Sequence, residues 1–456
     1  MLKPGYFFSS SFAAAAAAAA RSRPRSIRPP PLRTVAMMMA VTPLVIVSAS
    51  STTRTEDKAT ETTTTTGDKS HHKQGGGFVN PWPSFKSVNM GPTVPYQVWK
   101  DTKDPIPPPD KLPRLVPPTF TPPASLSPEE TEAWYADLKT TWLGHACFLV
   151  EFPAPPPPGD VAERGKGEAR RGFRVLFDPV WSHRCSPSQL IGPARVTKPP
   201  ISLDEIPAVD AVVISHNHYD HLDVATLKHL YGAQPKGSLH FFVPLGNEKW
   251  MRSVIGVRES EVSELDWWDE RSLRRSSEAA AGPSNSRSVV EANLRVVCTP
   301  CQHFTGRSLM DRNDTLWASW AVQSSTGGKV WFGGDTGYRS VARDAVSEDG
   351  PTCPVFAEIG QREGPFDVGM IPIGAYQPRW IMSPVHCSPE DSVELHQHVR
   401  SKKSFGMHWA TWRLTSEEMT EPPKRLRAAC RKVGIADEAF GVTDIGETVR
   451  TKVSAS

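Results

Sequence analysis

The sequence predicts an α/β domain over most of the 456-residue chain. From about residue 137 onward, short apolar segments alternate with segments of helical pattern. One apolar segment, AVDAVVIS at 208–215, is a continuous run of the kind found in strands that are buried on both faces. Alternation of such strands with helices indicates a sheet that is covered on both sides.

The expected strands are runs of apolar and β-branched residues. Two helices are also expected. The first, 222–232, would end at Gly232, and the second, 389–402, has Ser388 as an N-cap and acidic residues in its first turn. In order along the chain the expected strands are 138–152, 174–180, 208–215, 239–246, 294–300, 329–335 and 366–373.

Residues 1–55 form a predicted targeting segment. They contain no Asp or Glu, seven Lys or Arg, and a run of eight alanines. Acid-poor termini rich in Arg and Ser are typical of transit peptides to a mitochondrion or plastid, whereas the apolar stretch 36–49 leaves a secretory signal or a disordered tail open. That stretch is shorter than the ~18–20 residues that a membrane span requires, and no later segment is long and apolar enough either.

The rest of the chain divides into three predicted parts. Residues 56–77 are rich in Thr and Gly and nearly free of apolar residues, which predicts a disordered linker. Residues 78–136 are rich in proline, which favours an extended arm packed on the folded body. Residues 137–456 would form the folded domain, with polar surface inserts at 153–172 and 271–293.

Charge and cysteine content exclude two classes of protein. The net charge is +3, but residues 1–55 contribute +7, so the remainder carries 3 − 7 = −4. A mildly acidic body does not indicate a nucleic-acid-binding protein. The seven cysteines are odd in number and widely spaced, which does not indicate a disulfide framework. Cys298 and Cys301 form a lone CxxC pair, for which we expect a core or loop role.

The sequence HNHYDH at 216–221 follows the apolar segment 208–215 directly. His216 and His218 are two residues apart, so on an extended backbone both side chains point to one side. Asp220 and His221 follow where the chain turns toward a helix, so they can address a second point nearby. Imidazole and carboxylate groups are the ligands that divalent metals such as zinc prefer. The apolar run before them disfavours the alternative of a solvated His-rich turn.

Four ligands do not complete two metal sites, and further His or Asp residues occur at later strand ends. His303 lies just past the expected strand 294–300, and Asp335 ends the expected strand 329–335. His408 follows another apolar segment, SFGM. Since strand ends provide rigid support, we expect these side chains to converge with the HNHYDH segment on a site for two metal ions.

The order of these motifs resembles the HxHxDH signature of the metallo-β-lactamase superfamily. More closely, the chain from about Phe78 to Gly446 is similar to the N-acylphosphatidylethanolamine-hydrolysing phospholipase D family. This resemblance implies an αββα four-layer sandwich, a metallo-β-lactamase-type hydrolase domain and two Zn²⁺ ions. It depends on FVNPWPSF (78–85), TWLGHACFLVEF (141–152), SPSQLIGPAR (186–195), ISHNHYDHLD (214–223), FFVPLG (241–246), ELDWW (264–268), LMDRNDTLWASW (309–320), GGDTGY (333–338), IPIGAYQPRW (371–380) and GMHWATW (406–412).

The resemblance also implies roles for individual residues. His145, in WLGHA, would line the site, support a metal ligand through a hydrogen bond, or serve as a core histidine. The implied ligands of one zinc are His216, His218 and His303, those of the other are Asp220, His221 and His408, and Asp335 would bridge both ions and take part in catalysis with a metal-bound hydroxide. The implied contacts to the phospholipid substrate are Tyr219, His386 and Gln189.

The function that the resemblance implies is zinc-dependent hydrolysis of N-acylphosphatidylethanolamine to N-acylethanolamine and phosphatidic acid. Two zinc ions indicate hydrolysis as the class of reaction, since they lower the pKa of bound water toward neutrality. The alternative is a lactonase or a small-molecule phosphodiesterase of the same fold. A third possibility is a protein that uses zinc only for stability. The scarcity of Cys among the expected ligands argues against this third possibility, because structural zinc sites favour Cys. The resemblance further implies peripheral membrane contact, a membrane-associated location and a possible homodimer.

Overall fold

Side chains of the central strands alternate between two apolar cores, as the two-residue period of a strand requires. The computed structural model describes residues 44–47, 69–87, 106–156, 170–278, 289–308 and 310–453. In strand β5 (Ala211–Val213), Ala211 and Val213 enter one core, and Val212 enters the other. Burial on both faces explains the continuous apolar run that the sequence shows at this strand.

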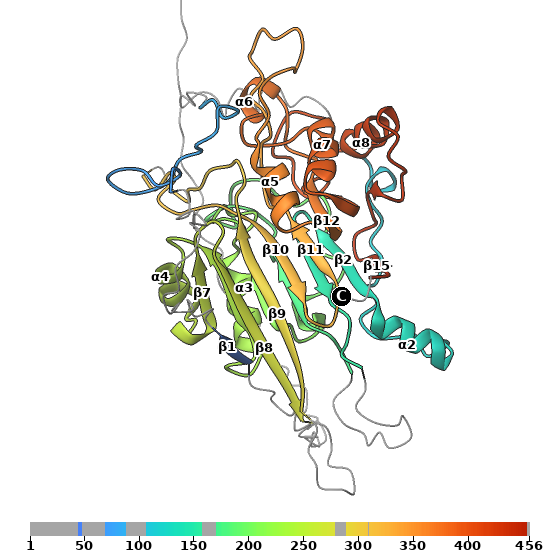
Figure 1. Ribbon diagram of the computed structural model, residues 1–456. Coiled ribbons are helices and arrows are strands. Elements are labelled where there is room, and N and C mark those ends of the chain that lie inside the picture. The colour runs from blue at the N-terminus through green and yellow to red at the C-terminus, as the bar shows by residue number, and fades with distance from the viewer. Residues whose placement is uncertain are drawn as a thin grey trace, which may run out of the picture. The chain divides into compact units, whose positions relative to one another are not determined.

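The strands form two sheets (Figure 1). The eight-stranded sheet has the order β1-β8-β9-β10-β11-β12-β13-β14, and the seven-stranded sheet has the order β15-β2-β3-β4-β5-β6-β7. The strands of the first are β1 (Leu44–Val47), β8 (Glu270–Glu278), β9 (Val289–Thr299), β10 (Ser319–Ser324), β11 (Lys329–Phe332), β12 (Phe366–Pro372), β13 (Ser401–Met407) and β14 (Phe440–Gly441). Those of the second are β15 (Thr448–Thr451), β2 (Leu138–Gly144), β3 (Cys147–Glu151), β4 (Arg174–Phe177), β5, β6 (His240–Pro244) and β7 (Val262–Leu265).

Helices cover the outer face of each sheet. The two sheets pack face to face through contacts such as that of Phe177 with Phe332, whose ring centroids lie 4.8 Å apart. On one outer face, Leu227 of α3 packs in the second core, and on the other, Phe356 of α5 packs 6.1 Å from the ring of Trp331. The arrangement is the expected αββα four-layer sandwich. The helices are α2 (Pro128–Ala136), α3 (Val224–Ala233), α4 (Glu248–Trp250), α5 (Val355–Arg362), α6 (Arg379–Met382), α7 (Pro389–His398) and α8 (Glu421–Lys432), with 3₁₀ turns at Pro109–Lys111, Leu203–Glu205 and Glu259–Glu261 and a π-helical turn at Met251–Ile255.

The prediction of a single strand over 138–152 is wrong. The segment forms two antiparallel strands, β2 and β3, joined by a tight turn. Gly144 has a φ of +100° and His145 a φ of +52°, so the chain reverses within two residues. The apolar sequence hides this turn, because it contains no Asn-Gly or Pro signal.

The prediction that 271–293 is a surface insert is also wrong for the part that the structure describes. β8 and β9 form a long antiparallel hairpin, in which Leu273 pairs with Leu294. Both side chains are fully buried. The sequence of β8 does not have the pattern of a strand, because it is rich in Arg and Ser. Leu273 is its single apolar residue. Residues 279–288 lie outside the described part.

Other predicted boundaries are only partly covered. Residues 1–43 and 48–68, and most of the insert 153–172, lie outside the described residues, so the targeting segment stays a prediction. Residues 69–77 were predicted to belong to a disordered linker, but the structure holds them on the body, where His71 is only 3% exposed. None of the helices in the described ranges is both long and apolar enough to cross a membrane.

Candidate metal centre

The HNHYDH segment forms the loop between β5 and α3. His216 and His221 are buried, with 1% and 0% exposure, whereas His218 and Asp220 are half-buried. Asp223 ends the loop by capping α3, and its carboxylate also accepts hydrogen bonds from Ser182. The loop is therefore fixed at both ends, by a buried strand and by a capped helix.

The remaining predicted ligands follow three strands of the other sheet. His303 lies after β9, Asp335 after β11, and His408 directly after β13. Strands β11, β12 and β13 are parallel, and β9 runs in the same direction because β10 is antiparallel to both of its neighbours. The carboxyl ends of these strands therefore meet at one edge of the sheet, opposite the β5–α3 loop.

The carboxylate of Asp335 lies at the centre of the cluster. Its Oδ1 is 3.1 Å from His408 Nε2, and its Oδ2 is 3.2 Å from His221 Nε2. The same Oδ2 is 3.7 Å from His303 Nε2 and 3.9 Å from His216 Nε2. Asp335 is thus shared by histidines that come from both sheets.

The possible ligand atoms divide into two main groups around this carboxylate. Within each group, the atoms lie within 4.8 Å of one another. Apart from His145, the division is the one that the family resemblance implies. The first group is His216, His218 and His303, and the second is Asp220, His221, His408 and His145.

Several buried polar atoms in the cluster have no hydrogen-bond partner. They include His221 Nε2, His408 Nε2 and Asp335 Oδ1, although the last two lie only 3.1 Å apart. Leaving such atoms unsatisfied costs ~1–3 kcal/mol each. A divalent cation held between them would satisfy all three, so the residues fit a metal ion.

The charge states of the histidines also suit a metal site. Burial lowers the pKa of His216 and His303 well below the usual range, and that of His218 to about 4. These rings are therefore neutral at pH 7, which is the form that binds metal. Although burial opposes it, the carboxylates of Asp335 and Asp220 raise the pKa of His408 to about 9. A bound metal cation would take the place of the proton that the carboxylates of Asp335 and Asp220 stabilise on the ring of His408.

Hydrogen bonds fix the orientation of the rings. His221 Nδ1 donates to Asp178 Oδ2 at 2.7 Å, and His303 Nδ1 donates to the carbonyl of Val385 at 2.8 Å, so that each Nε2 faces the carboxylate of Asp335. His145 Nε2 donates to Asp220 at 2.9 Å, so it supports a predicted ligand, which is one of its expected roles. Sequence reasoning missed Asp178, although its position directly after the apolar strand β4 was a signal.

The structure separates the three predicted substrate contacts. His386 lines the cavity above the cluster, with Nε2 3.9 Å from Asp335 Oδ2. Tyr219 donates its hydroxyl to the carbonyl of Arg307, and Gln189 exchanges hydrogen bonds with the backbone of Arg184. Neither Tyr219 nor Gln189 is among the residues that line the cavity, and their contact with substrate stays a prediction.

The cavity combines an apolar wall with a polar base. One wall carries Arg312, whose guanidinium group lies 4.5 Å from the ring centroid of Phe304. A positively charged side chain therefore lines the same cavity as the predicted metal ligands. The apolar wall includes Phe85, Phe304, Ile381, Met382, Val385 and Leu414, and the base is formed by His218, Asp220, Asp335, His386 and His408.

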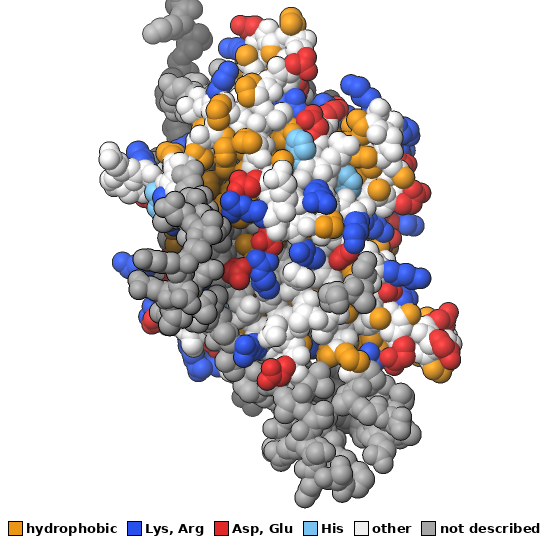
Figure 2. All heavy atoms as spheres, in the orientation of Figure 1, with side chains coloured by type: hydrophobic (Ala, Val, Ile, Leu, Met, Phe, Trp, Pro, Cys, Tyr) orange, Lys and Arg blue, Asp and Glu red, His pale blue; other side chains and the backbone are white. Residues whose placement is uncertain are grey.

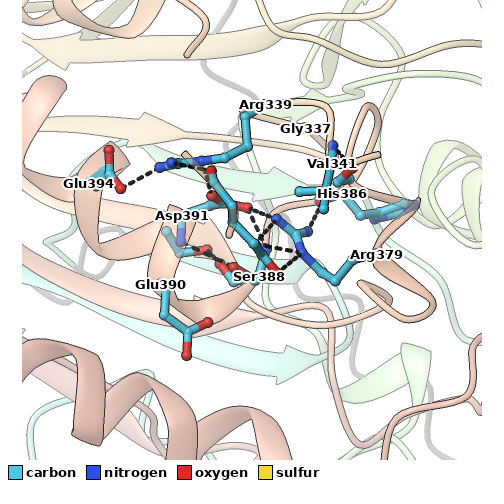
Figure 3. A network of polar contacts seen from close by, with 12 residues as sticks. Gly337, Arg339, Val341, Arg379, His386, Ser388, Glu390, Asp391 and Glu394 are labelled. Carbon is cyan, nitrogen blue, oxygen red and sulfur yellow. Dashed lines mark hydrogen bonds and ion pairs between the residues drawn. The ribbon is translucent and has the colours of Figure 1, made fainter. Parts of the chain in front are cut away.

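A buried ion network supports the loop that carries His386 (Figure 3). Asp391 accepts a hydrogen bond from Arg379 Nη2 at 2.6 Å and one from Arg339 Nε at 2.7 Å. Arg379 also donates to the carbonyl of His386 at 3.3 Å. Ser388 and Asp391 form a capping box that begins α7. The network therefore joins α6, α7 and the loop between them.

Comparison with known proteins agrees with this fold. Residues 173–409, more than half of the chain, match the Beta-lactamase superfamily domain. N-acyl-phosphatidylethanolamine-hydrolyzing phospholipase D 1 of Caenorhabditis elegans is 35% identical over 68% of this chain and 75% of its own length. An uncharacterized protein of Mycobacterium tuberculosis is 40% identical over 64% of each chain. The mitochondrial N-acyl-phosphatidylethanolamine-hydrolyzing phospholipase D of Saccharomyces cerevisiae is 28% identical over 70% of this chain and 57% of its own length.

The fold and the His/Asp cluster define a hydrolase of the metallo-β-lactamase superfamily with a site for divalent metal. Within that superfamily, the chain belongs to the N-acylphosphatidylethanolamine-hydrolysing phospholipase D family. It spans less than two thirds of the length of the mycobacterial and yeast relatives.

Proposed function

We propose that the protein hydrolyses the phosphodiester bond on the headgroup side of N-acylphosphatidylethanolamine and uses two zinc ions. The products would be N-acylethanolamine and phosphatidic acid. The observation that carries the proposal is the Asp335 carboxylate, shared by two groups of ligands at the base of an apolar cavity. Membership of the family supports the choice of substrate.

When bound, two zinc ions supply Lewis acidity, which lowers the pKa of water and offsets negative charge on a phosphodiester. Asp335 would contact both ions, and the hydrogen bond from His221 to Asp178 would keep that ring in its ligand orientation. His386, whose Nε2 lies 3.9 Å from Asp335 Oδ2, would contact a phosphate oxygen of the substrate. The ions would be held by His216, His218 and His303 on one side and by Asp220, His221 and His408 on the other.

The cavity walls suit an anionic lipid. The apolar side chains of Phe85, Ile381 and Leu414 provide a surface for acyl chains. Arg312 adds a cation that favours a phosphodiester over a neutral substrate such as a lactone. This charge favours the phospholipase over the lactonase of the same fold.

The test is an assay of the full chain, loaded with Zn²⁺, on N-acylphosphatidylethanolamine in mixed micelles. We expect release of N-acylethanolamine and phosphatidic acid in equal amounts. A lactone and a cyclic phosphodiester serve as comparison substrates. If the zinc-loaded protein hydrolyses either of these and releases no N-acylethanolamine, the alternative function replaces the proposed one.

We also propose peripheral contact with a membrane through exposed apolar residues on two loops. Leu190 and Ile191, which are 87% and 70% exposed, lie on the loop whose His183 carbonyl accepts a hydrogen bond from Trp412. Met310, 90% exposed, follows Phe304 on a second loop. Figure 2 shows hydrophobic side chains gathered in the upper part of one face, around α6 and the neighbouring loops.

Replacing both Leu190 and Ile191 by Gln should weaken binding to phospholipid vesicles about tenfold, because partial burial of two such side chains is worth more than ~1 kcal/mol. Co-sedimentation with vesicles measures the change. Val433→Gln removes an apolar residue that is 49% exposed at the end of α8, and it should leave vesicle binding unchanged. Equal binding by the double variant and the wild type would refute contact through this loop.

We also propose a cellular location and an oligomeric state for the protein. The composition of residues 1–55 supports targeting to an organelle, and the yeast relative is named as a mitochondrial protein. We retain a membrane-associated location in a mitochondrion or plastid, with the secretory pathway as the alternative. Homodimer formation is proposed from the family resemblance alone.

A further inference from the structure

Residues 69–87, which we call the strap, lie before the predicted folded domain yet are held on it. The first part is a small hairpin, in which Val79 donates its amide to the carbonyl of His71 at 2.9 Å. Gly75, Gly76 and Gly77 all have positive φ and form its turn. At Gly77 a Cβ atom would lie 2.8 Å from the carbonyl oxygen of Asn313, so only glycine allows this close approach.

Asp266, directly after β7, anchors the hairpin. Its Oδ1 accepts a hydrogen bond from His71 Nε2 at 2.7 Å, and its Oδ2 accepts one from His72 Nε2 at 2.8 Å. The ring of His71 also stacks on Trp267, with centroids 4.2 Å apart. Lys69 pairs with the same Asp266 carboxylate, so the cluster is an ion-pair anchor rather than a second cation site.

The far end of the strap reaches the metal centre. Asn80 Nδ2 donates to the backbone carbonyl of His303 at 2.8 Å. Ser84 Oγ donates to the side chain of Gln302, the residue before His303, at 2.6 Å. Phe85 then enters the wall of the cavity. The strap therefore holds the backbone carbonyl of His303 and the side chain of the residue before it.

We propose that the strap positions His303 as a metal ligand, with Asn80 as the positioning residue and Asp266 as its anchor. The ring of His303 is fixed by Val385, and Asn80 fixes the backbone from which that ring projects. The inference rests on the proposed role of His303 in binding metal. The inference places residues from Lys69 onward in the functional part of the chain, well before residue 137, where the folded domain was predicted to begin.

The first test is Asn80→Ala in the full chain. We expect an affinity for Zn²⁺ about tenfold lower, because loss of a group that supports a metal ligand usually costs ~10–100-fold. Competition with a chromophoric chelator measures this affinity without an assay of activity. In the enzyme assay, kcat should fall while KM changes little, since Asn80 does not line the cavity.

Asn247→Ala is the matched control. Asn247 donates its side-chain amide to the carbonyl of Pro244 at 2.8 Å, which is the same kind of contact as that of Asn80. It is not among the residues that line the cavity. We expect this variant to lose thermal stability and to keep the Zn²⁺ affinity of the wild type. Equal losses of affinity in both variants would overturn the inference.

The second test is Asp266→Asn, which removes the charge that Lys69, His71 and His72 share but keeps an oxygen acceptor. We expect faster hydrogen exchange at the amide of Val79 and a fall in Zn²⁺ affinity in the same direction as for Asn80→Ala. If both variants bind Zn²⁺ as the wild type does, the strap is only structural. If the wild type releases no N-acylethanolamine, the proposed substrate fails, but the comparison of Zn²⁺ affinities still decides on the strap.

Discussion

Asp335→Ala should reduce hydrolysis at least about a thousandfold and lower the metal content together with it. Among the described residues, Asp335 is the one carboxylate that lies within 3.2 Å of ring nitrogens of both His221 and His408 and within 3.9 Å of His216 and His303. A metal acting as a Lewis acid stabilises the transition state by several kcal/mol, and each ~1.4 kcal/mol of stabilisation is a factor of ten in rate. Metal analysis and the rate of N-acylethanolamine release from the same preparation measure both effects.

Asp367→Ala is the control for this variant. Asp367 is also a buried aspartate, but it lies near the start of β12 and pairs with Lys402 at 2.8 Å. We expect it to lower stability while metal content and turnover per folded molecule stay close to the wild type. Full metal content and full activity in Asp335→Ala would refute the role of Asp335.

The sequence predicted the fold class and the residues that cluster in the candidate site better than it predicted the boundaries of some strands. The segment HNHYDH is local, and its two-residue spacing together with the apolar run before it indicates ligands at a strand end. His303, Asp335 and His408 share the same local signal, an apolar strand immediately before them. Their convergence at one edge follows from parallel strands, which short apolar runs also indicate.

Partners that are distant in sequence could not be predicted in this way. Asp178 supports His221 across 43 positions, and Asn80 reaches His303 across 223 positions. The sequence around Asp178 and around Asn80 contains no pattern that indicates which residue each of them contacts. The turn at Gly144 and His145 was also missed, because the apolar segment around it contains no Asn-Gly or Pro signal.

Asp391→Ala should destabilise the protein by about 3–5 kcal/mol, because it leaves two guanidinium groups without their buried partner. The side chain of Asp391 is 2% exposed, and those of Arg379 and Arg339 are 8% and 11% exposed, so water cannot replace the lost carboxylate. The capping box at Ser388 is lost as well. Unfolding in urea, followed by circular dichroism, measures the change in the free energy of unfolding.

Two further variants separate the buried network from ordinary surface charge. Glu390→Ala removes the neighbouring carboxylate, which pairs with Arg425 at 2.8 Å and is 48% exposed, and it should cost less than ~1 kcal/mol. Adding Arg379→Met to Asp391→Ala should recover part of the lost stability, because it removes one of the two buried cations that have lost their buried carboxylate partner. A double variant less stable than Asp391→Ala would show that Arg379 contributes mainly through its contacts with Glu348 and the carbonyl of His386. In that case KM for the lipid should rise along with the loss of stability, since His386 lines the cavity.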